Sequence, residues 1–158
     1  MYKRVLVTLD GSPLAEAILP FITEIAGPLD VEVVLLRVVV PTPPQVGEAT
    51  RHVVIEDIEG RLAEARQYLA PLAAQLATRG VRVRTEVRRG DPVAEISAAA
   101  AEVGADLVAM TTHGRTALGR VLFGSVAEAV LRHVEIPVFL MRLSKSRMKA
   151  HESREAAR

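Results

Sequence analysis

The stretch RVLVTLDGSPLAEAILPFITEIAG, residues 4–27, sets a pattern that the rest of the chain repeats. Its opening RVLVTL is almost entirely apolar and rich in Val and Leu, which predicts a strand buried on both faces. A helix should follow at once, because Ser12 is a suitable N-cap and Pro13 suits the first helical position. Gly27 can end this helix, and Pro20 should kink or divide it.

The same succession of apolar strand and helix continues to residue 142. Strands are predicted at 4–9, 31–40, 81–88, 106–111 and 136–142, and helices at 12–27, 54–80, 91–104 and from Ser125, where Glu128 would complete a capping box. Residues 81–88 alternate between polar and apolar, so that strand should have one solvent-facing side and lie near an edge. The Pro-rich segment 41–52 predicts a loop, which could fold over a ligand as a lid.

This alternation predicts an α/β fold, with a single doubly wound, five-stranded parallel sheet and helices on both faces. Right-handed crossovers favour the strand order 3-2-1-4-5. In that order the first and fourth strands are neighbours whose connections leave to opposite faces, so a crevice should open beyond their carboxyl ends. One domain is expected over residues 1–143, followed by a charged tail over 144–158 that is mobile or loosely helical.

Composition argues against several classes of function. A net charge of +1 and an aromatic content of 3% are unlike those of a nucleic-acid-binding protein. The absence of cysteine excludes thiolate metal sites and cysteine nucleophiles. No apolar run is long enough to span a membrane and the N-terminus lacks a signal-peptide pattern, so we expect no membrane partner and a cytoplasmic location.

Two segments should meet at the crevice, and both suit a phosphorylated ligand. Asp10 follows the first strand, and its carboxylate fits a ribose hydroxyl or a metal ion better than a phosphate. After the fourth strand, Gly114 and Gly124 can adopt positive φ and let a ligand approach the backbone. The helix that starts at Ser125 presents free N–H groups and the positive end of its dipole, which favour an anion.

The sequence resembles the universal stress protein family over residues 2–142. The resemblance is carried by VLVTLDGS near the start, by THG and FGSVAEAVLRH, and by the closing IPVFLMR. The ATP-binding branch of that family carries the pattern Gly-x2-Gly-x9-Gly-Ser/Thr, and this chain has Thr111-x2-Gly114-x9-Gly124-Ser125. The spacing matches, with Thr111 in place of the first glycine.

The resemblance implies that the chain binds ATP, which Mg²⁺ can accompany. It implies that Asp10 lies beside the nucleotide, that the Val38 backbone contacts adenine, and that Ser125 and Val126 contact phosphate. The full predicted site comprises Thr8, Leu9, Asp10, Val38, Met110, Thr111, Thr112, His113, Gly114, Arg115, Thr116, Ala117, Gly124, Ser125, Val126 and Ala127. No catalytic or metal-binding role is assigned to any of them.

The function predicted from these features is that of a stress-response, ATP-binding protein that acts as a dimeric regulatory or sensor module. Little or no catalysis is expected, because the sequence shows no nucleophile–base pair, metal triad or paired carboxylates. A homodimer is expected through the apolar edge strand 136–142. Two alternatives stay open. One is a nucleotide-processing enzyme, either a slow ATPase or an AMP-forming transferase. The other is a dimeric interaction module without nucleotide, which stays open because Thr111 replaces the first glycine of the pattern.

Overall fold

The structure, a computed structural model, describes residues 2–41, 48–113 and 124–143. The strands are β1 (Arg4–Thr8), β2 (Glu32–Val39), β3 (Val83–Arg89), β4 (Leu107–His113) and β5 (Val138–Leu143). The helices are α1 (Pro13–Glu16), α2 (Leu19–Ala26), α3 (Glu48–Thr78), α4 (Pro92–Val103) and α5 (Ser125–His133). The predicted tail 144–158 lies outside the described residues.

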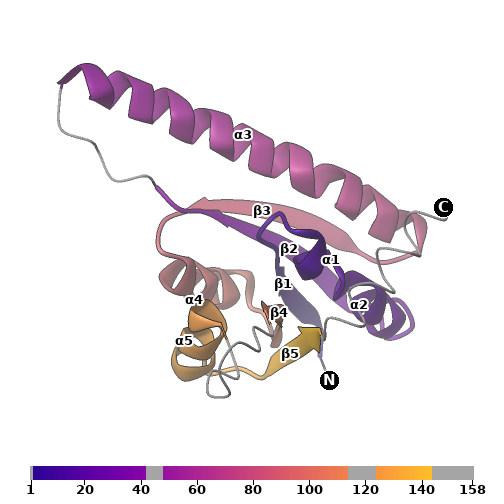
Figure 1. The fold of residues 1–158 in the computed structure, drawn as a ribbon. Helices are drawn as coiled ribbons and strands as arrows, with labels where there is room; N and C mark the ends of the chain where they lie inside the picture. The colour runs from indigo at the N-terminus through magenta and orange to yellow at the C-terminus, as the bar shows by residue number, and fades with distance from the viewer. Residues whose placement is uncertain (1, 42–47, 114–123, 144–158) are drawn as a thin grey trace.

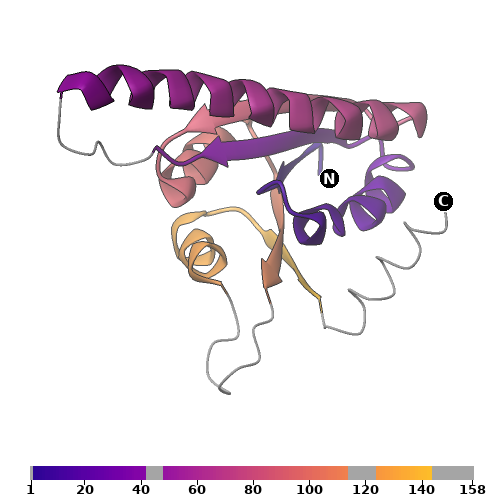
Figure 2. The same cartoon turned by 45° about the horizontal axis from the view of Figure 1, so that its top comes forward.

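The five strands form one parallel sheet in the order β3-β2-β1-β4-β5, which confirms the predicted fold class and strand order. Helices α1, α2 and α3 cover one face, and α4 and α5 cover the other (Figure 1, Figure 2). Among the described helices, none has both the length and the apolar character needed to cross a membrane.

The apolar runs of the inner strands follow from this double cover. In β1, Val5 and Val7 pack into the core under α1, α2 and α3, while Leu6 packs into the core under α4 and α5. Successive side chains of a strand point to opposite faces, so a strand buried on both sides has no position for a polar residue. The edge strand β3 is half exposed, as its alternating sequence predicted.

The helix ends largely follow the sequence signals. Ser12 Oγ accepts a hydrogen bond from the Ala15 amide at 3.1 Å, and Asp91 Oδ1 accepts one from the Ala94 amide at 2.9 Å. The first predicted helix is divided into α1 and α2, with Pro20 in the first turn of α2.

The predicted loop 41–52 is wrong over its last five residues, because α3 already begins at Glu48. The last proline of that segment is Pro44, so nothing after it removes a backbone donor or prevents a helix. The part of the predicted loop at 42–47 lies outside the described residues.

Two glycines should respond in opposite directions to the same substitution. Gly104 ends α4 in the left-handed conformation with φ 63°, so Gly104→Ala should destabilise the fold by about 1 kcal/mol. Gly60 lies in α3, where an added Cβ would meet no described atom within 4 Å, so Gly60→Ala should stabilise the fold by about 0.5–1 kcal/mol. Urea unfolding measures both; a neutral Gly104→Ala or a destabilising Gly60→Ala contradicts this account.

Candidate functional site

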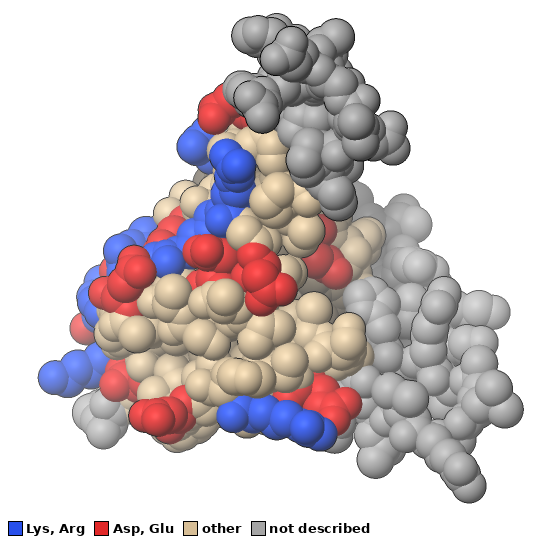
Figure 3. All heavy atoms as spheres, turned by 90° about the vertical axis from the view of Figure 1, so that its left-hand side faces the viewer, with Lys and Arg blue, Asp and Glu red and all other residues tan. Residues whose placement is uncertain are grey.

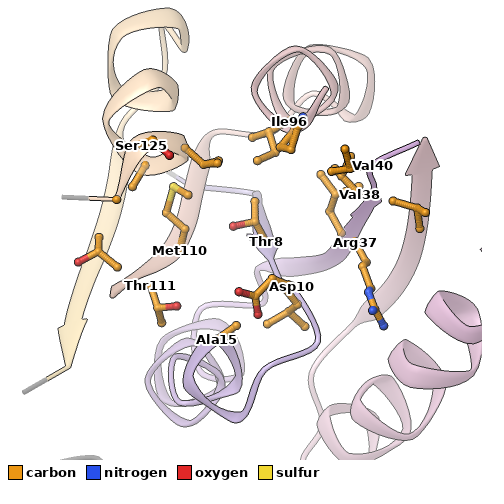
Figure 4. Close-up of a pocket in the computed structure, with 18 of the residues that line it drawn as sticks. Thr8, Asp10, Ala15, Arg37, Val38, Val40, Ile96, Met110, Thr111 and Ser125 are labelled. Carbon is orange, nitrogen blue, oxygen red and sulfur yellow. The ribbon is translucent and has the colours of Figure 1, made fainter. Parts of the chain in front are cut away.

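A cavity of about 470 Å³ opens beyond the carboxyl ends of β1, β2 and β4. Helices α3, α4 and α5 also contribute to its walls (Figure 4). It lies where the connections that follow β1 and β4 leave to opposite faces of the sheet, as the strand order predicted. Its volume is within the range of small-molecule sites.

One end of the cavity is formed by the start of α5. Residues 124–127 all line it. The first helical hydrogen bond runs from the Glu128 amide to the Gly124 carbonyl at 3.0 Å. The amides of Ser125, Val126 and Ala127 therefore precede the helical bonding pattern, and no side chain of the described residues caps them. Free amides and the positive end of the helix dipole together favour an anion here.

The predicted capping box at Ser125 is wrong. The N-cap is Gly124, with the extended backbone that this position requires (φ −67°, ψ 154°), and Ser125 is already the first helical residue. The predicted positive φ at Gly124 is wrong for the same reason, because an N-cap has negative φ.

Neither its backbone nor its packing explains why residue 124 is glycine. Any residue can adopt its φ and ψ, and a Cβ added there would meet no described atom within 4 Å. Since Ser, Thr, Asn and Asp are the better N-caps, the fold itself would gain from a side chain here. The missing side chain instead leaves the first turn of α5 open to the cavity.

The turn after β1 forms the middle of the cavity. Asp10 Oδ1 accepts hydrogen bonds from the Ser12 amide at 2.9 Å and from Ser12 Oγ at 2.6 Å. This closed turn requires φ 88° at Gly11, a value that favours glycine. Asp10 is exposed, and its Oδ2 is not used by the turn, so that oxygen can accept a hydrogen bond from a ligand hydroxyl.

Arg37 lies beside this turn and extends toward α3 (Figure 4). Its guanidinium carbon lies 4.9 Å from the centre of the Tyr68 ring, a cation–π arrangement. On the other side it packs against Gly11, where an added Cβ would lie 3.0 Å from Arg37 Nη2. Arg37 thus forms a layer between the Asp10 turn and α3.

Tyr68 is held neutral in this layer. Burial, and then the neighbouring Glu16 carboxylate, raise the pKa of Tyr68 far above its ordinary value. No hydrogen bond of standard geometry reaches the Tyr68 hydroxyl from any described residue.

The opposite end of the cavity is apolar. Val38 and Val40 come from the end of β2 and the residues after it, and Ile96 from α4 (Figure 4). Val40 is 48% exposed, a large apolar side chain at the edge of the cavity. A flat, apolar ring can bind between these side chains, since burying apolar surface is favourable and geometrically undemanding.

The end of β4 lies on the same side of the cavity as the start of α5 (Figure 4). Met110, Thr111 and Thr112 all line it, and Thr111 is only partly buried. Thr112 is 2% exposed, and its hydroxyl has no hydrogen-bond partner among the described residues.

The structure brings together most of the predicted site residues. Those that line the cavity are Thr8, Leu9, Asp10, Val38, Met110, Thr111, Thr112, Gly124, Ser125, Val126 and Ala127. Gly114, Arg115, Thr116 and Ala117 lie outside the described residues, and of His113 only its place at the end of β4 is described.

Sequence reasoning missed the lining residues Ala15, Leu36, Arg37, Val39, Val40, Arg61, Glu64, Pro92 and Ile96. Arg61 and Glu64 lie in a helix rich in charge, where they resemble ordinary solvent-facing residues. Arg37 directly precedes Val38, a predicted site residue at the end of a strand. That position was the signal that could have identified Arg37 as a lining residue.

Charges on the surface are mixed. Figure 3 shows acidic and basic side chains intermingled on the face it presents, without a large area of one sign among the coloured atoms. This distribution agrees with the net charge of +1.

Comparison with known proteins identifies relatives along nearly the whole chain. The model of the universal stress protein family matches residues 1–142. Universal stress protein MJ0531 of Methanocaldococcus jannaschii is 32% identical over 148 residues, which cover 92% of this chain and 85% of that protein.

Solved structures share the fold. MJ0577 of the same organism superposes with a TM-score of 0.79 at 28% identity. The match covers 92% of this chain and 99% of the MJ0577 chain. A universal stress protein in complex with cAMP superposes with a TM-score of 0.60 at 25% identity, covering 90% of this chain and 98% of its own. The chain described here belongs to the universal stress protein family.

Proposed function

We propose that this chain binds an adenine nucleotide, ATP foremost, in the cavity. Its phosphates would lie at the first turn of α5, its ribose near Asp10, and its base among Val38, Val40 and Ile96. One observation carries the proposal: a single cavity joins a cluster of free amides to an apolar end, with an exposed carboxylate between them. A nucleotide has its anionic, hydroxyl-bearing and apolar parts in the same order.

The relative in complex with cAMP supports adenine as the base. The order of chemical groups along the cavity supports a nucleotide but does not by itself choose between purines, so this relative adds independent support. Mg²⁺ can accompany a bound triphosphate, and Asp10 is the cavity carboxylate on the β1–α1 turn that could reach such an ion.

We further propose that nucleotide binding serves a regulatory or sensor role in a stress response, in a homodimer. The edge position of β5 supports the dimer, because no described strand pairs with its outer side, where a strand of a partner could be added. Phe139 on this strand is 36% exposed, which adds an apolar contact for a partner.

Calorimetric titration of the purified chain with ATP, ADP, AMP and GTP, each with and without Mg²⁺, tests the binding proposal. We expect saturable binding of the adenine nucleotides and much weaker binding of GTP. Release of ADP or AMP over many turnovers would instead identify a nucleotide-processing enzyme. Failure of all four to bind would favour an interaction module without nucleotide.

Substitution of Gly124 should separate stability from binding. Gly124→Asp adds a good N-cap, so the free energy of unfolding should rise by roughly a few tenths of a kcal/mol. The new carboxylate would lie where phosphate is proposed to bind, and the affinity for ATP should fall by about a hundredfold or more. Thermal unfolding and calorimetry measure the two effects.

Gly124→Asn is the matched control, because asparagine has the same shape, caps helices equally well and carries no charge. It should stabilise the fold like Gly124→Asp and weaken ATP binding less. Equal affinities of wild type and Gly124→Asp would exclude phosphate from the start of α5.

The apolar end can be tested at Val40. Val40→Ser removes an exposed apolar contact, so AMP binding should weaken by about threefold to tenfold with little effect on stability. Leu29→Ser is the control, because Leu29 is 50% exposed and does not line the cavity. If both variants bind AMP as wild type does, the base does not contact Val40.

A further inference from the structure

Thr112 is the polar residue that the described core buries, with only 2% of its surface exposed. In the part of the chain that the structure describes, its hydroxyl has no hydrogen-bond partner. Most buried polar groups are paired, because a hydroxyl that loses its water without a new partner weakens the fold. An orphaned hydroxyl beside a cavity therefore calls for an explanation.

The strand places Thr112 on the same face of the sheet as α5. Side chains two residues apart in a strand share a face, so Thr112 lies on the side of Met110, in the core under α4 and α5. Both residues line the cavity, together with the first turn of α5. Thr112 is therefore the hydroxyl-bearing core residue on the face where the free amides lie.

The Thr112 hydroxyl is shielded from solvent, but it does not have to move far to meet a ligand. A rotation of about 120° around the Cα–Cβ bond exchanges the hydroxyl with the γ-methyl group. The common side-chain rotamers in strands differ by a rotation of this kind. Since the hydroxyl has no hydrogen bond to a described residue in its present position, it loses no such bond by turning.

Resting on the proposed function, we infer that Thr112 Oγ1 donates a hydrogen bond to a phosphate oxygen of the bound nucleotide. Donation, rather than acceptance, follows from the neighbouring amides and helix dipole, which make this end of the cavity a place for an anion. The phosphate gains a side-chain donor beside the amides of α5, and the hydroxyl gains the partner that it lacks.

Ser125, which sequence analysis assigned to phosphate, differs from Thr112 in this respect. Ser125 is exposed, so its hydroxyl can bond to water in the absence of ligand. A bond from Ser125 to phosphate would replace a bond to water, with a small net gain. A bond from Thr112 would satisfy a group that is otherwise unpaired, so Thr112 should contribute more.

Thr112→Val tests the inference, because valine keeps the shape of threonine and replaces the hydroxyl with a methyl group. Without ligand, the variant should melt about 2–4 °C higher than wild type, since the orphaned hydroxyl is gone. Its affinity for AMP should fall by about tenfold or more, since a hydrogen bond to a charged group is lost. The same substitution thus stabilises the fold and weakens binding.

Two controls separate the ligand contact from a structural effect. Thr112→Ser keeps the hydroxyl and should keep AMP affinity within about threefold of wild type. Tyr68→Phe removes the other buried, unpartnered hydroxyl among the described residues, which does not line the cavity. It should melt no lower than wild type and bind AMP equally well.

Competition by adenosine against AMP completes the test. Thr112→Val should bind adenosine as wild type does, because adenosine has no phosphate. The inference is overturned if Thr112→Val binds AMP as tightly as wild type does, or if it loses affinity for AMP and adenosine equally. The proposed function stands in either case. If wild type binds neither, the proposed function fails and this inference with it.

Discussion

A parallel sheet covered by helices on both faces constrains where a ligand can bind in this protein. The connections that follow β1 and β4 must leave to opposite faces, so the chain cannot close the gap between these two strand ends. The cavity lies in that gap. The helix that follows β4 begins at the cavity wall, and its first amides have no intrahelical carbonyl to which they can donate a hydrogen bond. The position of the site therefore follows from the strand order of the fold.

The walls of the cavity show which local features are built for stability and which are not. Among the described helix starts, Ser12 caps α1 and Asp91 caps α4 through their side chains, whereas α2 begins at Ile18 without a side-chain cap. Helix α5 begins with glycine instead, although nothing described nearby would obstruct a larger residue. Thr112 adds a second departure, an unpaired hydroxyl in an otherwise apolar core. Such departures from local optimality are expected where a ligand binds, because groups reserved for it are unsatisfied in its absence.

Most of the fold could be predicted from the sequence, because the inner strands are mostly apolar and two helices carry recognisable starts at Ser12 and Asp91. The errors arose where two signals competed. Ser125 and Glu128 have the spacing of a capping box, but the backbone places the cap one residue earlier, and spacing cannot reveal that shift. Arg37, Arg61 and Glu64 were missed because tertiary packing, rather than a local pattern, brings β2 and α3 to the cavity.

The most direct test of the account is the response of the α5 amides to a phosphorylated ligand. In ¹H–¹⁵N correlation spectra of the labelled protein, titration with AMP should move the amide proton resonances of Val126 and Ala127 downfield, as expected for new hydrogen bonds to an anion, whereas adenosine should leave them nearly unchanged. Saturable AMP binding that leaves both resonances in place would contradict the central claim that the free start of α5 holds the phosphate.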